Sequence, residues 1–205
     1  MARTKAQAPK QRDAEATKAR ILAAATSEFA ERGLAGARVD AIAERAHANK
    51  QLIYAYFGSK EKLFGAVLRN QIHELVEEVE IDPEHFAEYA GRVFDWHAEH
   101  PDLVRLLLHE GLEYGTGPVP GDEARAEHSR RKVEAVRAEQ KRGGMDDSLD
   151  ARDLVMLVIA LATAGDALPQ LARMTEGADP SSPRARSRRR AAAVEIVRRA
   201  ATRGP

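Results

Sequence analysis

The sequence has no cysteine, few aromatic residues and no long apolar run, and each absence excludes a class of protein. Without cysteine there is no disulfide, no thiolate nucleophile and no Cys-ligated zinc. Aromatic residues make up 5% of the chain, whereas alanine and leucine are plentiful, which favours helices. No apolar run approaches the ~18 residues of a membrane span, and the polar N-terminus lacks the apolar core of a signal peptide. A cytoplasmic protein without a membrane segment is therefore expected.

The motifs of enzymes and metal sites are also missing. The sequence contains no Gly-rich phosphate loop, no HExxH and no serine elbow. His97, His100 and His109 recur without a metal-ligand spacing, which favours histidines on a helix surface or in a pocket. We therefore expect no catalytic residue, no metal and no cofactor.

The zero net charge conceals a strong segregation of charge along the chain. Residues 1–60 carry 11 Lys and Arg against 6 Asp and Glu, residues 61–180 carry 13 against 25, and residues 181–205 carry 8 against 1. This pattern suggests two domains, with a basic N-terminal part suited to a polyanion such as DNA. The arginine run at 184–190 is interpreted as a solvated face rather than a second DNA site.

Residues 38–57, RVDAIAERAHANKQLIYAYF, indicate two short helices joined by a tight turn. Val39, Ile42, Ala43 and Ala46 fall at i, i+3, i+4 and i+7, which is one face of a helix. Asn49 is a strong N-cap residue for a second helix over about residues 50–57. This layout is that of a helix-turn-helix, in which the second helix enters the DNA major groove.

The side chains expected to point outward from the second helix suit DNA binding. Lys50 can reach a phosphate or guanine, Gln51 can pair with adenine, and Tyr54 and Tyr56 can donate to phosphates. Lys60 follows Ser59, the expected cap of the next helix, and can clamp a phosphate there. The alternative for the two helices is a helical hairpin with a solvated face, and the alternative for Lys60 is an ordinary solvated lysine.

The remaining N-terminal residues predict support for this pair of helices. Residues 1–14 are expected to form a disordered arm, interpreted as a solubilising tail or as a segment that touches DNA. A first helix over 17–32 is predicted to pack across the helix-turn-helix, with Gly33 at its C-terminal end. A long fourth helix over 59–80 carries a continuous apolar stripe and should link the two domains.

The rest of the chain predicts further helices, expected over 84–99, 102–114, 122–142, 149–174 and 183–203, with a Gly- and Pro-rich loop at 115–121. The stretch LVMLVIALATA, residues 154–164, is apolar on every side and must be buried on every side. We interpret its helix as half of a homodimer interface, the alternative being the central core helix of a monomer.

Three segments carry a resemblance to a known family. TKARILAAATSEFAERG, VDAIAERA and NKQLIYAYFGSKEKLFGAVL together resemble the N-terminal domain of the tetracycline-repressor (TetR) family over about residues 17–70. The resemblance implies an all-α protein of about nine helices. Residues 15–75 would form the three-helix helix-turn-helix DNA-binding domain, and residues 76–205 a helical ligand-binding and dimerisation domain.

Matching the family position by position implies a set of DNA-contacting residues: Arg38, Val39, His47, Asn49, Lys50, Gln51, Tyr54, Tyr56 and Lys60. The chain departs from the family at His47, which stands where glycine is frequent in the turn. Histidine tolerates the left-handed conformation better than most residues, so the turn is expected to survive. Leu52 replaces a frequent small or polar residue, which leaves the base preference there open.

The family also implies partners. Its last two helices form a four-helix bundle across a two-fold axis, which here predicts a homodimer through about 149–174 and 183–203. An effector pocket is expected in the C-terminal domain, with candidate lining residues that equally read as plain core: Phe94, Trp96, His97, Tyr114 and Met156.

The predicted function is that of a transcriptional regulator that binds double-stranded DNA. The resemblance favours a repressor released from a pseudo-palindromic operator by a small-molecule effector. The two recognition helices of the dimer would enter major grooves about one helical turn, ~34 Å, apart. The alternative is a small-molecule-binding or scaffold protein of the same fold that no longer reads DNA.

Overall fold

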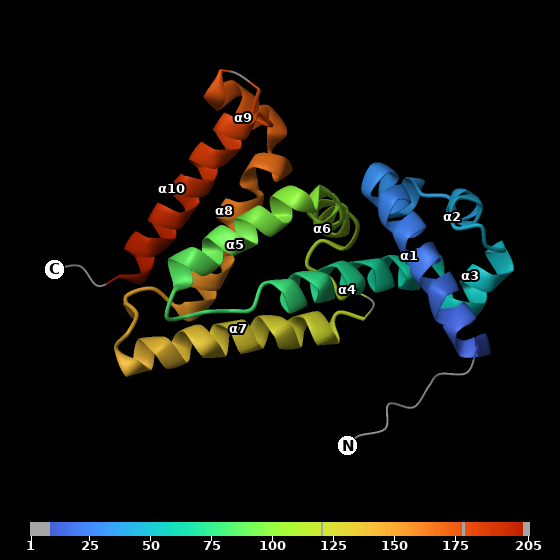
Figure 1. The fold of residues 1–205 in the computed structure, drawn as a ribbon, viewed down its shortest axis with the longest axis horizontal. Helices are drawn as coiled ribbons and strands as arrows, with labels where there is room; N and C mark the ends of the chain where they lie inside the picture. The colour runs from blue at the N-terminus through green and yellow to red at the C-terminus, as the bar shows by residue number, and fades with distance from the viewer. Residues whose placement is uncertain (1–8, 120, 178, 203–205) are drawn as a thin grey trace. The chain divides into compact units, whose positions relative to one another are not determined.

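The computed structural model describes the backbone of residues 9–119, 121–177 and 179–202, and within these ranges the chain is all-α (Figure 1). The expected fold class is therefore confirmed. The helices are α1 (Pro9–Gly36), α2 (Val39–Arg45), α3 (Lys50–Phe57), α4 (Lys60–Glu78), α5 (Phe86–Glu99), α6 (Pro101–Tyr114), α7 (Glu123–Arg142), α8 (Ala151–Ala167), α9 (Pro169–Glu176) and α10 (Pro183–Ala201).

The helices form two compact units, and the division falls inside α4 and α6. Unit 1 comprises residues 1–70 and 106–122, and unit 2 comprises residues 71–105 and 123–205. This grouping differs from the contiguous division at residue 75 expected from the sequence, because the second half of α6 and the loop after it group with the N-terminal helices. Such a grouping depends on contacts between distant residues, which no local pattern records.

Unit 1 has one apolar core to which α1, α2, α3 and α4 each contribute. Phe29 and Phe64 are fully buried, and their rings meet edge-to-face with centroids 5.1 Å apart. Ile42 of α2 and Ile53 of α3 are buried with them. The helix-turn-helix is therefore held in place by packing that includes α4, as expected for a domain too small to form a large core alone.

Helix α1 begins earlier than the sequence predicted. It starts at Pro9, so residues 9–14, expected to be part of a disordered arm, are helical; residues 1–8 lie outside the described residues. Proline is well tolerated in the first turn of a helix, and the Ala-, Glu- and Lys-rich residues that follow are good helix formers. Helical geometry is interrupted at Gly33, whose φ of 68° suits glycine.

The core of unit 2 lies where α5 packs against α8 and α10. It is built from apolar side chains buried on all three helices, among them Val93, Phe94, Leu154, Val158, Ala193 and Val197. A bidentate ion pair also ties α10 to α5: Arg190 donates to both carboxylate oxygens of Asp95 at 2.6 and 2.7 Å.

The predicted single helix over 149–174 was wrong. Asp150 caps α8, accepting a hydrogen bond from the backbone of Arg152, and α8 ends at Ala167. Pro169 then begins α9, at 81° to α8. Proline lacks the N–H of the helical ladder and its ring clashes with the preceding turn, so the helix breaks there. This break raises the described helices from about nine to ten.

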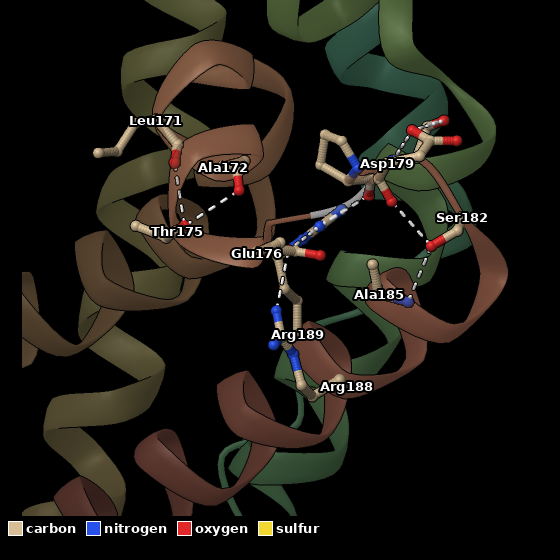
Figure 2. A network of polar contacts seen from close by, with 11 residues as sticks. Leu171, Ala172, Thr175, Glu176, Asp179, Ser182, Ala185, Arg188 and Arg189 are labelled. Atoms are coloured by element: carbon tan, nitrogen blue, oxygen red, sulfur yellow. Dashed lines mark hydrogen bonds and ion pairs between the residues drawn. The ribbon is translucent and has the colours of Figure 1, made fainter.

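A buried carboxylate holds α9 against the start of α10 (Figure 2). The side chain of Glu176 is 6% exposed; it accepts a hydrogen bond from Arg189 at 2.6 Å and forms an ion pair with Arg188 at 3.0 Å. Arg189 also donates to the carbonyl of Pro180 at 2.8 Å, and Ser182 caps α10 through the backbone of Ala185. The bend between α8 and α9 therefore has a defined geometry.

In the described part of the chain, no individual helix combines the length and apolar character needed to cross a membrane. Only α8 and α9 taken together satisfy those requirements, and they are sharply bent.

Candidate nucleic-acid interface

The turn between α2 and α3 has the geometry predicted from the sequence. His47 has a φ of 48° and, among the described residues, is the only non-glycine residue with a positive φ. Asn49 caps α3, its side-chain oxygen accepting a hydrogen bond from the backbone of Gln51 at 2.7 Å. Arg20 of α1 donates to the carbonyl of Ala46 at 3.3 Å. The left-handed residue and the cap predicted here are both confirmed.

Helix α3 exposes the polar face that the sequence predicted. Ile53 is 2% exposed and faces the core, whereas Lys50, Gln51 and Tyr54 are exposed, Tyr54 to 41%. Tyr56 is only half-buried, with the ammonium of Lys18 5.5 Å from its ring centroid. A row of hydrogen-bonding side chains thus lies on the exposed side of a short helix, which is the arrangement that contacts base edges and phosphates.

Lys50 forms an ion pair with Asp40 on this surface. Its ammonium lies 2.9 and 3.1 Å from the two carboxylate oxygens of Asp40, at the start of α2. The hydrogen bond and charge of Asp40 raise the pKa of Lys50, so the lysine stays cationic. This pairing was not predicted, because two exposed residues ten positions apart on different helices leave no periodic signal.

A second carboxylate missed by sequence reasoning organises the start of α2. Glu28 of α1 is 1% exposed and accepts a hydrogen bond from the backbone N–H of Arg38 at 3.1 Å. It also lies 3.4 Å from Arg32 and 3.9 Å from Arg45. The only sequence signal was the i,i+4 spacing of Glu28 and Arg32, which ordinarily marks a solvated surface pair.

Lys60 occupies a different environment from the one predicted. Its ammonium donates to the carbonyl oxygens of Ala35 and Ala37 at 3.3 and 3.4 Å. It therefore joins the start of α4 to the C-terminal end of α1 and the residue that follows it. The cap before it is as predicted, since Ser59 accepts a hydrogen bond from the backbone of Lys62 at 3.2 Å. A phosphate contact by Lys60 stays a prediction.

One of the predicted contact residues is buried. Val39 is 7% exposed and belongs to the core of unit 1, so its side chain is engaged there and a DNA contact by its backbone N–H at the start of α2 stays a prediction. Val39 begins the apolar face of α2, and burial of that face determines where its side chain lies. Arg38, the residue before it, is exposed and is the side chain available at this end of α2.

The predicted effector-pocket residues belong to both units. Phe94, Trp96 and His97 are buried on α5, whereas Tyr114 belongs to unit 1. Met156 is 66% exposed on α8, and its assignment to a pocket stays a prediction. It lies on the helix face opposite the buried Leu154 and Val158, because residues two positions away project from another side of a helix.

The α5 aromatic residues show which polar groups are already paired. The indole of Trp96 donates to Glu78 at 3.0 Å, and the ring of Trp96 stacks on His100 at a centroid distance of 3.9 Å. In contrast, Nδ1 of His97 is buried without a hydrogen-bond partner among the described residues. Burial, aided by the charges of Lys132 and His100, lowers the pKa of His97 from 6.5 to about 4.

Acidification is therefore expected to destabilise unit 2 through His97. The folded-state pKa is depressed, so the stabilisation is fully present above pH 6.5 and is lost as the pH falls towards 4. The total loss from this one group is about 3 kcal/mol. Urea unfolding of the full chain, followed by circular dichroism at a series of pH values, measures it.

The non-titrating variant His97→Leu isolates this contribution from that of the carboxylates. Its free energy of unfolding should fall less steeply than that of the unchanged protein between pH 6.5 and 4. His73→Gln, which changes an exposed histidine of α4, is the matched control. A pH dependence that is identical in the unchanged protein and His97→Leu contradicts the assignment.

Among the described residues, no group of three or more His, Asp or Glu side chains is arranged to hold a metal ion.

Comparison with known proteins covers both units. Residues 21–67 match the family described as "Bacterial regulatory proteins, tetR family", and residues 85–199 match "Tetracyclin repressor-like, C-terminal domain". The HTH-type transcriptional repressor SCO4008 of Streptomyces coelicolor is 49% identical over 166 residues, which is 81% of this chain and 86% of the relative. The HTH-type transcriptional repressor NicS of Pseudomonas putida is 37% identical over 109 residues, about half of each chain.

Solved structures of transcriptional regulators have the same fold as this chain. The putative transcriptional regulator SCO4942 from Streptomyces coelicolor superposes with a TM-score of 0.77 at 35% identity, covering 92% of this chain and 99% of that chain. FadR from Bacillus subtilis, solved in complex with stearoyl-CoA, shares the fold at a TM-score of 0.64 and 16% identity, covering 87% of this chain and 96% of that chain.

A helix-turn-helix with an exposed polar second helix, combined with a separate all-helical unit, defines a DNA-binding transcriptional regulator. The matches extend over most of the chain and include close relatives named as repressors. The chain belongs to the tetR family of bacterial regulatory proteins.

Proposed function

We propose that the chain is a homodimeric repressor that leaves a pseudo-palindromic operator when a small molecule binds to unit 2. The observation that carries the proposal is the exposed face of α3, where Lys50, Gln51 and Tyr54 lie together on a helix fixed by a cap and a buried Ile53. The two relatives named as repressors support the direction of regulation. The chain would act in the cytoplasm, where bacterial DNA is accessible, and not as an enzyme.

In this proposal α3 enters the major groove. Lys50 and Gln51 form hydrogen bonds with base edges, while the hydroxyl of Tyr54 donates a hydrogen bond to a phosphate or base. Contacts to the DNA phosphate backbone come from Arg38, His47 and Asn49, which are exposed, together with Tyr56 and Lys60. These residues lie on α3, in the turn before it and at the starts of α2 and α4.

The homodimer is proposed to form through α8 and α10. Helix α8 buries one face inside unit 2 yet leaves Met156, 66% exposed, with Ala160 and Ala164 on the other face. On α10, Ile196 is 44% exposed. Leu168, between α8 and α9, and Leu171 and Met174 of α9 are all more than half exposed. Apolar side chains gathered on neighbouring helices are suited to burial against a second copy.

The effector is proposed to bind in unit 2 near α5. His97 offers a buried ring nitrogen without a hydrogen-bond partner among the described residues. The ring of Trp96 lies beside it at a centroid distance of 5.5 Å, and Phe94 is buried on the same helix. A pocket with a mostly apolar lining and few polar groups is the usual small-molecule site. Binding would release the operator only to the extent that the effector prefers the state that does not bind DNA.

Replacing Lys50 or Tyr54 by alanine is expected to weaken operator binding while leaving fold and dimer intact. Each variant removes a contact made twice per dimer, so the affinity should fall by about 10- to 100-fold. Operator sites are first obtained by selecting bound duplexes from a random library, and gel shifts then compare the variants at several salt concentrations. Affinity should fall steeply with added salt, because phosphate contacts release counterions.

The matched control is Arg131→Ala, which removes an exposed cation of α7 paired with Glu127. It should bind the operator like the unchanged protein. Equal affinity of Lys50→Ala and the control, or a flat salt response, contradicts the groove assignment. If the library selection returns no preferred sequence at all, a scaffold or small-molecule-binding role of the same fold becomes the better description.

A further inference from the structure

The pairing of Lys50 with Asp40 links the two helices of the helix-turn-helix across their exposed surface. The ammonium contacts both carboxylate oxygens, at 2.9 and 3.1 Å, and both side chains are open to solvent, Lys50 to 47% and Asp40 to 60%. Pairs exposed to this degree contribute little to stability. We therefore look for the effect of this pair in how strongly Lys50 binds the groups of DNA that approach it.

A carboxylate at this position affects phosphates and bases differently. A DNA phosphate that approaches Lys50 also approaches Asp40, and the two anions repel each other. A guanine edge carries neutral acceptors at O6 and N7, so it can accept from Lys50 without that repulsion. An ammonium has three N–H donors, so Lys50 can keep a hydrogen bond to Asp40 while it donates to a base.

We propose that Asp40 is a specificity-determining residue of the DNA interface, which holds Lys50 for base edges and prevents it from serving as a general phosphate contact. This inference rests on the proposed function, since it requires that α3 reads DNA. Asp40 acts through Lys50 and is a positioning residue that makes no attractive contact with DNA. Its carboxylate lowers affinity for non-operator DNA more than affinity for the operator.

The substitution Asp40→Asn keeps the size of the side chain and removes its charge. Lys50 then becomes available to phosphates on any sequence, which adds one phosphate contact per subunit. Each added contact raises affinity about eightfold at 0.1 M salt and steepens the dependence of log K on log salt by about 0.9. Non-operator DNA should gain this affinity in full and the operator much less, so the ratio of the two affinities should fall about fivefold or more.

The experiment uses the full chain and two fluorescent duplexes of equal length, one with the selected operator and one with a scrambled sequence. Binding anisotropy at several salt concentrations gives the two affinities and the two salt slopes. Glu44→Gln is the matched control, because it removes one exposed negative charge from the same helix. Any general gain from the lost charge appears in both variants, and only Asp40→Asn should lower the affinity ratio.

The Lys50→Met variant separates a failure of this inference from a failure of the proposed function. In the Lys50→Met background, Asp40→Asn should no longer steepen the salt slope for non-operator DNA. If Lys50→Met weakens operator binding but Asp40→Asn behaves like Glu44→Gln, the role given to Asp40 is overturned and the DNA-binding assignment stands. If Lys50→Met leaves operator binding unchanged, the assignment of Lys50 to the groove fails, and the role of Asp40 with it.

Discussion

Met156→Glu combined with Ile196→Glu is expected to convert the protein to a monomer and to reduce operator affinity by about 100-fold or more. Both side chains are exposed and apolar, on α8 and α10 respectively. In a two-fold interface each substitution occurs twice, so four carboxylates would be buried without partners. The monomer keeps one recognition helix and loses the gain from binding two linked half-sites.

Sedimentation velocity measures the oligomeric state of this variant, and anisotropy with the selected operator measures its affinity. Leu112→Glu, which adds the same charge at a side chain 85% exposed on α6, is the control for oligomeric state and should remain dimeric. Far-ultraviolet circular dichroism confirms that the helices are retained. A double variant that sediments as a dimer rules out this surface as the interface.

Glu28→Ala is expected to destabilise unit 1 by about 2 kcal/mol and to weaken operator binding. The substitution leaves the backbone N–H of Arg38 without an acceptor and removes the buried carboxylate beside Arg32 and Arg45. The start of α2 should then open more often. The measurement is hydrogen exchange of the amides of Arg38 and Ile42 in the full chain, since exchange reports local opening directly.

Two further variants test whether the effect comes from the buried acceptor at Glu28. Glu28→Gln retains an oxygen acceptor for the Arg38 amide and should restore most of the exchange protection. Glu31→Ala, at an exposed residue 3.5 Å from Arg45, should cost less than about 1 kcal/mol. Exchange of the Arg38 amide that is equally fast in Glu28→Ala and Glu31→Ala contradicts a role for the buried carboxylate.

The recognition helix was predictable because its signals are local. The bounds of α3, the cap at Asn49 and the left-handed His47 all follow from residues within a few positions of one another. Capping and turn conformations depend on side chains that reach only the nearby backbone, so the sequence contains the whole cause. The same holds for the fold class, which follows from apolar periodicity and composition.

The error at α8 has a different origin. Pro169 was visible in the sequence, but the apolar stretch before it continued into Leu171 and Met174, and a single helix over 149–174 was predicted. The proline breaks that helix, and the buried pairing of Glu176 with Arg189 holds the new direction. A local breaker should therefore have outweighed the apolar pattern.

The sequence by itself determined that this protein is all-helical, that residues 38–57 form a helix-turn-helix, and that Lys50, Gln51 and Tyr54 point outward. Only the tertiary structure decided which charges are engaged: Asp40 with Lys50, Glu28 with the start of α2, and Lys60 with the carbonyls of Ala35 and Ala37. It likewise decided that Val39 is buried and that Met156 is exposed. The reason is that periodicity describes one helix at a time, whereas burial and ion pairing depend on how separate helices pack together.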